Sequence, residues 1–550
     1  MLAGKQTFWH SRRAFFGYLN GWSILTLVIS IIFIGPFVSL FVVASGDAEG
    51  LWGHLMDTVA PRYALNTMVL MLGVGTLSLI FGITTGWVVA RFQFPYARVF
   101  EWGLLLPCTV PAYIIAYTYT DFLEYAGPVQ IFLREIFGWT SARDYWFPEI
   151  RSMGGAMLVM SSVLYPYIYL LSRTAFRQTS RSYIEIAKIQ NPSSAILIEL
   201  KLARPAIIAG LALVLMEVLS DFGTVEFFAV ETLTLGIFNI WLGMNNIAAA
   251  AQIAIMAFIF ILSLLAIERA ARKRQRFYDG TKRNVPVLPY SLSSSKSAAC
   301  VFVCLVPIIL GFVIPISVLL NFIFRGLATS NLENLTTAAI NSIWLSFFVS
   351  IIVIGLASAM VITTTYKEQP FLNWLSTTSS LGYAFPGAIL AIGVVSFAGG
   401  VDSITEKLLA YSQLKIFDSF LIGGSGLLIL ACVIRFQAVG YGSILAGVAR
   451  LSPNIFAASA SLGYGFSRTV FTLSPPLLLK SMLAGGILVF VDTMKELPMT
   501  LLLRPFNYET LATFVYQFAK DELLEESALA AIMIIAMGLG PVMILNKYQR

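Results

Sequence analysis

The sequence predicts an all-α membrane protein: a polytopic bundle of about 12 transmembrane helices, built as two tandem six-helix modules. Composition is the first reason. Hydrophobic residues make up 58% of the 550 residues and charged residues only 12%, against about 25% charged in an average soluble domain. The apolar residues also gather into segments of about 20 residues, the length of helix that crosses a bilayer. Finally, an acidic spacing recurs at an offset of 275 residues, half of the chain.

Twelve apolar segments are each expected to form one membrane span. In chain order they lie at residues 22–45, 65–90, 101–120, 153–175, 205–222, 247–267, 298–323, 341–364, 375–399, 419–448, 477–500 and 526–546. The first segment follows Lys5, Arg12 and Arg13 and is longer than the core of a signal peptide, so it is predicted to be an uncleaved span.

The distribution of basic residues predicts the orientation of the chain. Most of the 36 Lys and Arg residues fall in segments on the same side as the N-terminus, which places both termini in the cytoplasm by the positive-inside rule. The densest basic cluster lies at residues 269–283, and the segment 276–297 is interpreted as a cytoplasmic linker. Its alternative role is binding of lipid or nucleotide. Because the net charge of +7 follows the topology, it does not indicate a nucleic-acid partner.

The internal repeat divides the chain into a first module at residues 1–275 and a second at 298–550. Glu217 and Asp221 near the end of the fifth predicted span correspond to Asp492 and Glu496 in the eleventh, and each pair is four residues apart. A spacing of four puts both members of a pair on one face of a helix. Because each module has an even number of spans, the two insert in the same orientation, with a pathway at their interface.

These four carboxylates are candidates for lining the pathway, because charge within a membrane span is costly and often functional. Oxygen ligands also suit hard cations. The competing interpretation is structural: Lys495 and Arg435 neutralise the acids between helices. No residue is assigned firmly as a metal ligand. Cys300 and Cys304 are expected to pack as small apolar side chains, with a metal or disulfide role as the alternative. Tyr113, Tyr117 and Tyr119 are expected to form an interfacial aromatic belt, with phenolate coordination of ferric iron as the alternative.

Two similar cytoplasmic loops, at about residues 177–204 and 450–476, follow the fourth span of each module. The second contains small residues, a glycine at which the chain turns, and a proline: Ala457, Ala458, Gly463 and Pro476. The first has Glu185, Ala187, Asn191 and Pro205, with Asn at the glycine position. Asn is the next best residue for a left-handed turn. Such loops are expected to dock a soluble partner; the alternative is a helical hairpin with no partner.

These loops resemble the coupling loop of bacterial ATP-binding-cassette (ABC) importer permeases. The signature of that loop is Glu-Ala-Ala, three residues, Gly, nine residues, then Ile-x-Leu-Pro. Gly463 and Pro476 match in register, with Leu473 at the Ile position, whereas Ala457 replaces the signature acid and Pro475 replaces Leu. In the first loop the spacing to Pro205 is one residue longer than the signature. The resemblance therefore implies two coupling loops that differ in detail.

Further stretches resemble the fused permeases of bacterial ferric-iron ABC importers. They are Asp221-Phe222-Gly223-Thr224-Val225, Trp241-Leu242-Gly243-Met244, Ala248–Ala251, Lys495-Glu496-Leu497-Pro498 and Leu501-Leu502-Leu503-Arg504-Pro505. The resemblance implies an inner-membrane, multi-pass permease of the type I architecture. It also implies three partners besides the bilayer: two cytoplasmic ATPase subunits and a periplasmic ferric-iron-binding protein. Related fused permeases serve thiamine, phosphonates or polyamines, so these substrates remain alternatives.

The chain has no Gly-x-x-x-x-Gly-Lys-Ser/Thr phosphate loop. ATP is therefore expected on the partner subunits, and this chain is expected to bind no cofactor and to catalyse no reaction. A transporter driven by protons or sodium is the main alternative, since paired six-span repeats fit it equally well. An enzyme embedded in the membrane is the weakest reading, because the sequence offers no credible nucleophile and base pair.

Overall fold

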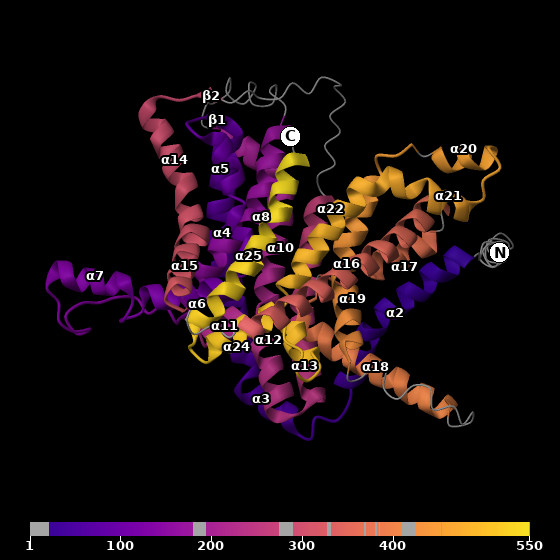
Figure 1. Cartoon of the computed structure of the whole chain (residues 1–550), viewed down its shortest axis with the longest axis horizontal. Helices are drawn as coiled ribbons and strands as arrows, with labels where there is room; N and C mark the ends of the chain where they lie inside the picture. The colour runs from indigo at the N-terminus through magenta and orange to yellow at the C-terminus, as the bar shows by residue number, and fades with distance from the viewer. Residues whose placement is uncertain are drawn as a thin grey trace, which may run out of the picture. The chain divides into compact units, whose positions relative to one another are not determined.

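The computed structural model describes residues 21–179, 194–273, 290–326, 332–367, 370–379, 382–383, 385–409, 424–452 and 454–548. These residues are almost entirely helical, as predicted (Figure 1). Ten described helices are long and apolar enough to cross a membrane, or eleven if one bent pair counts as a span. The chain forms two compact units, one of residues 1–43 with 341–508 and the other of residues 44–340 with 509–550.

The larger unit contains most of the first half of the chain and its last two helices. Its elements are α3 (Leu51–Thr58), α4 (Ala60–Arg91), β1 (Phe92–Gln93), α5 (Ala97–Gly103), η1 (Leu106–Thr109), α6 (Ala112–Leu123), α7 (Pro128–Phe137), α8 (Met153–Gln178), α10 (Ser194–Ser220), α11 (Gly223–Phe227), α12 (Leu233–Phe238), η2 (Asn239–Gly243), α13 (Ile247–Lys273), β2 (Tyr290–Ser291), α14 (Ser294–Ile308), η3 (Ile309–Val313), α15 (Ile314–Gly326), α24 (Leu511–Lys520) and α25 (Leu524–Tyr548).

The smaller unit contains the first described helix and most of the second half of the chain. Its elements are α2 (Gly21–Ala44), most of α16 (Leu332–Lys367), α17 (Pro370–Ser379), α18 (Gly387–Leu409), α19 (Ser425–Val448), α20 (Ile455–Ser461), α21 (Phe466–Thr472), α22 (Ser474–Met494) and α23 (Pro498–Leu503).

Close helix packing in the larger unit depends on glycine. A Cβ at Gly82 of α4 would lie 2.7 Å from the Cβ of Ile168 in α8, and one at Gly210 of α10 would lie 2.8 Å from the Cα of the same residue. Small residues let membrane helices approach closely. The α8 backbone can therefore lie directly against both α4 and α10.

The first and last described helices, α2 and α25, each pack against segments that are distant in the sequence. In the larger unit α25, yellow in Figure 1, lies beside α15 and η1, and Gly538 fits against Thr109. In the smaller unit α2 packs against α18 and the residues just before it: Gly35 faces the ring of Phe397, and the Phe37 and Phe385 ring centroids are 4.3 Å apart. Relative to the predicted modules 1–275 and 298–550, the compact units exchange the chain ends, and residues 298–340 also belong to the larger unit. The modules remain a prediction about the sequence repeat.

The end of the predicted linker is fixed to the first half by a short parallel pair, in which Phe92 and Gln93 of β1 align with Tyr290 and Ser291 of β2. The α14 helix then begins at Ser294, so the last residues of the predicted linker are already helical. Cys300 and Cys304 of α14 are free thiols in an apolar cluster with Leu104 and Tyr165, which agrees with their expected packing role.

Several predicted spans differ from the structure. The segment 101–120 is not one helix, because the chain bends by 93° between Ala97–Thr109 and Ala112–Phe137. Pro111 cannot donate a backbone hydrogen bond, and it begins a new helix instead of continuing the old one. The predicted span at 375–399 begins only at Gly387, after the separate α17, and the one at 419–448 begins at Ser425.

Tyr113, Tyr117 and Tyr119 do not form an exposed aromatic belt. All three belong to α6 and are nearly inaccessible, with 3–5% of each side chain exposed. Tyr119 donates a hydrogen bond to the Leu310 carbonyl, and Tyr117 packs against Phe227 of α11. The belt prediction failed because membrane depth alone cannot show which face of a helix is buried.

Candidate functional site

The second predicted coupling loop consists of two short helices joined at Gly463. The α20 helix ends at Ser461, and Gly463 has φ = +83°. The Gly463 N–H donates to the Ala460 carbonyl at 3.0 Å, and the Tyr464 N–H to the Ser459 carbonyl at 3.1 Å. This pair of bonds is the Schellman motif, which satisfies the free carbonyls at a helix C-terminus and favours glycine. Glycine at this position is therefore explained by local backbone geometry.

Side-chain contacts hold the two short helices together. The hydroxyls of Ser459 and Thr469 lie 2.6 Å apart and are buried. Phe456 of α20 packs on Phe466 of α21 and on Tyr366 of α16. These contacts make the loop a folded hairpin continuous with the body of the smaller unit.

The α2 helix supports this hairpin from the side. The Trp22 indole donates to the Ser467 hydroxyl at 2.8 Å, and its ring contacts Phe466 and Phe471. Together with Arg468 they line a groove of about 680 Å³.

The tip of the hairpin is apolar and accessible. Leu462 is 76% exposed and Phe471 is 72% exposed, and Ala457 and Ala458 are also at the surface. Pro476 is exposed in the first turn of α22, where a missing N–H costs no helical hydrogen bond. Small side chains beside large exposed apolar ones suit close contact with another protein, although a docking role for these residues remains a prediction.

The first predicted coupling loop is described only at its edges. Glu185, Ala187 and Asn191 lie outside the described residues. Pro205 is inside α10, which runs continuously from Ser194, whereas the corresponding part of the second loop is divided into α21 and α22. The two prolines aligned by sequence therefore occupy different positions, Pro205 within a helix and Pro476 at the start of one.

Two ion clusters, one buried and one partly exposed, flank the first loop, and sequence reasoning missed both. Arg91 at the end of α4 donates to Glu199 of α10 at 2.9 Å and to the Phe176 carbonyl of α8 at 2.7 Å; the Trp87 indole also donates to Glu199. Arg91 and Glu199 have 3% and 6% of their side chains exposed. Arg91 thus connects α8 and α10, the helices on either side of the first loop, to each other.

The second cluster is centred on Glu101 of α5. Its carboxylate lies 3.2 Å from the guanidinium of Arg173 and 2.8 Å from that of Arg177, both on α8. The available sequence signal was Arg173 itself, a basic residue inside a predicted span, which membrane proteins rarely leave unpaired.

The second-half carboxylates form ion pairs within the smaller unit. Lys495 lies 2.9 Å from Asp492 at the end of α22, and Arg435 of α19 lies 3.3 Å from Glu496. Arg435 and Glu496 are almost fully buried, with 7% and 6% of their side chains exposed, against Gly387, where a Cβ would lie 2.4 Å from the guanidinium. This geometry favours the structural alternative for Asp492 and Glu496.

The first-half carboxylate Asp221 stabilises the start of a short helix. Its Oδ2 accepts from the backbone N–H groups of Thr224 and Val225 at 3.0 and 3.2 Å, and its Oδ1 accepts from the Thr224 hydroxyl. Glu217 is half-buried one turn earlier on α10. Asp221 thus acts as a helix cap in the larger unit.

The two halves repeat this arrangement. Glu496, the counterpart of Asp221, accepts from the Met499 N–H at 3.0 Å, where α23 begins. In each half a carboxylate at the end of a long helix therefore receives the N–H three residues later, in the first turn of a short helix. Because Glu217 and Asp221 belong to one compact unit and Asp492 and Glu496 to the other, convergence of all four remains a prediction.

A further carboxylate of the larger unit was not predicted. Glu226 of α11 lies 3.4 Å from the Lys520 ammonium and accepts a hydrogen bond from the Tyr516 hydroxyl at 2.5 Å. Among the described residues, no group of three or more His, Cys, Asp or Glu side chains could hold a metal ion.

Comparison with known proteins now gives these features a context. Residues 78–277 match the family described as binding-protein-dependent transport system inner membrane component. An Fe(3+)-transport system permease protein of Haemophilus influenzae is 24% identical over 95% of this chain and 98% of its own length. A spermidine/putrescine transport system permease homologue of Mycoplasma genitalium is 25% identical over 39% of this chain and 70% of its own. A sulfate transport system permease protein of Synechococcus elongatus is 26% identical over 27% of this chain and 49% of its own.

Proposed function

We propose, from its similarity to binding-protein-dependent transport permeases, that this chain carries ferric iron across the inner membrane of a bacterial cell. It is a multi-pass permease subunit of the ABC importer class and not an enzyme. In this proposal a periplasmic binding protein delivers the iron, and two cytoplasmic ATPase subunits supply the energy. Both termini of the chain lie in the cytoplasm, and ATP binds only to the partner subunits.

The observation that carries the coupling role is the hairpin at Gly463. It joins two short helices by a left-handed turn, presents Leu462 and Phe471 to solvent, and continues through a proline pair into α22. An ATPase subunit that binds this hairpin can move α22 together with the hairpin. Glu185, Ala187, Asn191 and Pro205 are proposed to form the matching loop of the first half.

The proposed mechanism is alternating access. The ATPase subunits bind the two loops differently in their ATP-bound and nucleotide-free states, and this difference in binding free energy shifts the permease between outward-open and inward-open states. The chain contributes the translocation pathway and the two coupling loops that transmit the motion of the ATPase subunits. Glu217 and Asp221 are the acids proposed to lie along the path, while Asp492 and Glu496 are held in ion pairs.

Ferric iron as the substrate rests on one relative similar over its full length. The polyamine and sulfate permeases are similar over less of this chain, and the three named substrates differ in charge. A polyamine and a sulfate ion are therefore the alternatives to be tested beside iron.

Uptake measurements test the substrate and the energy source separately. Cells that lack the gene, with and without a plasmid copy, are given radiolabelled ferric iron, spermidine or sulfate. We expect only iron uptake to fall in the deletion strain and to return with the plasmid. Restoration of spermidine or sulfate uptake instead would assign another substrate within the same class.

The energy source is tested in vesicles that contain the chain, its ATPase subunits and the binding protein. Uptake is expected to require ATP on the side of the vesicle membrane that carries the ATPase subunits. It is also expected to persist when ionophores collapse the ion gradients. Uptake that needs a gradient and not ATP would establish the alternative, a secondary transporter.

A further inference from the structure

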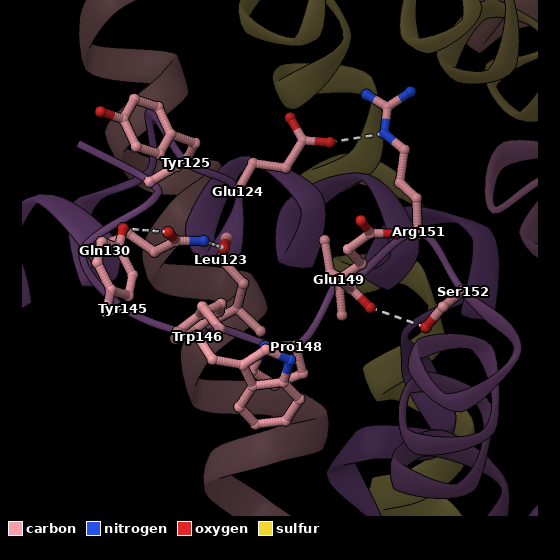
Figure 2. Close-up of a pocket in the computed structure, with 13 residues that line it drawn as sticks. Leu123, Glu124, Tyr125, Gln130, Tyr145, Trp146, Pro148, Glu149, Arg151 and Ser152 are labelled. Carbon is pink, nitrogen blue, oxygen red and sulfur yellow. Dashed lines mark hydrogen bonds and ion pairs between the residues drawn. The ribbon is translucent and has the colours of Figure 1, made fainter.

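The short helix α7 in the larger unit is amphipathic with its polar side facing the protein. The Gln130 side chain is buried; its amide donates to the Leu123 carbonyl at 2.7 Å and its carbonyl accepts from the Tyr145 hydroxyl at 2.5 Å. Arg134 donates to the Tyr125 carbonyl and to the Tyr145 hydroxyl, and its guanidinium lies 4.0 Å from the centre of the Tyr125 ring. Figure 2 shows Gln130 and Tyr145 directed toward each other.

The apolar residues of α7 point away from the protein. Ile131 is 40% exposed, Phe132 60%, Ile136 58% and Phe137 60%. Glu135 is the one charged residue of α7 that is exposed beside them. A surface helix in water has the reverse arrangement, with apolar residues inside and polar residues outside. The surroundings of α7 are therefore expected to be apolar.

The connections of α7 fix its level relative to the membrane. It follows α6 and leads through residues 138–152 to Met153, where the long span α8 begins; the far end of α8, at Gln178, leads into the first coupling loop. The helix thus lies at the ends of the spans opposite to that loop. In Figure 1 it extends sideways from the ends of α6 and α15, across the direction of α4 and α8.

The spans beside α7 also expose apolar side chains, as the outer face of α7 does. Near the same end of the unit, Phe324 of α15 is 79% exposed and Leu65 of α4 is 56% exposed, as expected of side chains that meet lipid. Leu72, further along α4, is 72% exposed.

Aromatic residues gather just after α7. Phe137, Trp139 and Tyr145 stack in sequence with centroid distances of 4.7 and 4.6 Å, and Trp146 is 84% exposed. Trp and Tyr are enriched where a membrane protein crosses the membrane–water interface. Short amphipathic helices with Phe and Leu on one face lie in this layer, parallel to the membrane.

We propose that α7 is an interfacial anchor that lies in the lipid leaflet opposite to the coupling loops. Its apolar face contacts acyl chains, and its polar face carries the 138–152 segment at headgroup level. Asp144 helps to fold that segment, because the backbone N–H groups of Thr140 and Ser141 donate to its carboxylate and lower its pKa. A lipid surface is favoured over a soluble partner because the spans that flank α7 expose the same kind of side chain at the same level. The inference does not depend on the substrate.

Spin labelling of the full chain in nanodiscs of phosphatidylethanolamine and phosphatidylglycerol tests this placement. Labels are attached to the variants Phe132→Cys and Ile136→Cys. The variant Leu72→Cys, on a span, is the lipid reference, and Ala142→Cys, an exposed position in the segment after α7, is the aqueous reference. The unsubstituted chain, treated in the same way, gives the background from the four native cysteines.

We expect labels at Phe132 and Ile136 to collide with oxygen as at Leu72 and to lose the access to the polar reagent NiEDDA that the Ala142 label retains. NiEDDA access at Phe132 equal to that at Ala142 would overturn the proposal, since the face would then be in water. Protection that appears only after a purified substrate-binding protein is added would also overturn it and assign the face to that protein. All four positions are exposed, so the substitutions should leave folding intact, and each variant can be checked by its uptake activity.

Discussion

At the scale of single residues, Gly463 has a conformational role that its exposed position would not suggest. A Cβ there would meet no atom within 4 Å, yet φ is +83°. The constraint therefore comes from the backbone and not from crowding. Gly465, two residues later, is equally open but has φ = −70°, which makes it a matched control.

Gly463→Ala is expected to destabilise the hairpin by about 1–2 kcal/mol, the cost of a left-handed conformation for a residue with a Cβ. Gly463→Asn should cost less, because Asn tolerates this region. If the hairpin couples the ATPases to transport, Gly463→Ala should lower iron uptake per ATP hydrolysed in reconstituted vesicles. Gly465→Ala should leave the uptake per ATP hydrolysed unchanged. An equal decrease of this ratio in both variants would contradict an effect that is specific to the left-handed turn.

Arg435 and Glu496 form the most buried acid–base pair in the part of the smaller unit that the structure describes. Arg435→Met leaves the Glu496 charge buried without this partner and should lower the free energy of unfolding by about 3–5 kcal/mol. The double variant Arg435→Met, Glu496→Gln should recover part of that loss, since it removes both charges. Thermal unfolding in detergent measures the stability of both variants, with Arg450→Met, at an exposed position just after α19, as the control. A single variant as stable as this control would show that the pair has no structural role.

At the scale of elements, the same design recurs where a long helix gives way to a short one. Asp221 precedes α11, and Glu496 precedes α23. Each carboxylate accepts backbone N–H groups that have no partner within the helix, as at other helix N-termini. A capping role and a pathway role for Asp221 predict different results from substitution.

Asp221→Asn keeps an oxygen that can accept the Thr224 and Val225 N–H groups, whereas Asp221→Leu does not. If capping is the main role, Asp221→Leu should lose about 0.5–2 kcal/mol of stability while Asp221→Asn stays close to the native protein in both stability and uptake. A pathway role instead predicts that Asp221→Asn is stable but transports poorly. Unfolding and uptake assays on the two variants, with Glu217→Gln beside them, separate the outcomes.

At the scale of the whole molecule, each compact unit contains pieces of both sequence halves. Residues 1–43 belong with 341–508, and residues 509–550 belong with 44–340. Neither half of the sequence can therefore complete a compact unit without the other.

Splitting the gene within the linker, to express fragments 1–281 and 282–550 separately, tests whether each compact unit needs both fragments. Co-expressed fragments should purify together through α2, α15 and α25, and should retain iron uptake. Each fragment expressed alone should be unstable, because helices that complete its packing are missing. Two fragments that are stable alone and do not associate would contradict the exchange of chain ends.

The helical class, most of the spans and the glycine turn of the second loop could be predicted from the sequence because they depend on local properties. The length of an apolar segment decides whether it can span the membrane. Gly463 indicates a left-handed backbone turn, a conformation that glycine favours. The carboxylate spacing in the two halves was equally visible. These signals lie within a few residues of one another along the chain.

Other features depended on contacts between distant segments, and only the tertiary structure decided them. Pro111 and its neighbours divide a predicted span, Arg435 selects Glu496 as its partner across 61 residues, and Arg91 meets Glu199 across 108. Which compact unit receives α2 or α25 is likewise set by packing among apolar faces that have similar composition. The sequence by itself determined a helical membrane protein, because burial of apolar length in lipid is a local requirement, and it located the glycine turn of the second loop. Tertiary structure decided which helices and charges pair, because many apolar surfaces are equivalent until shape and buried charge distinguish them.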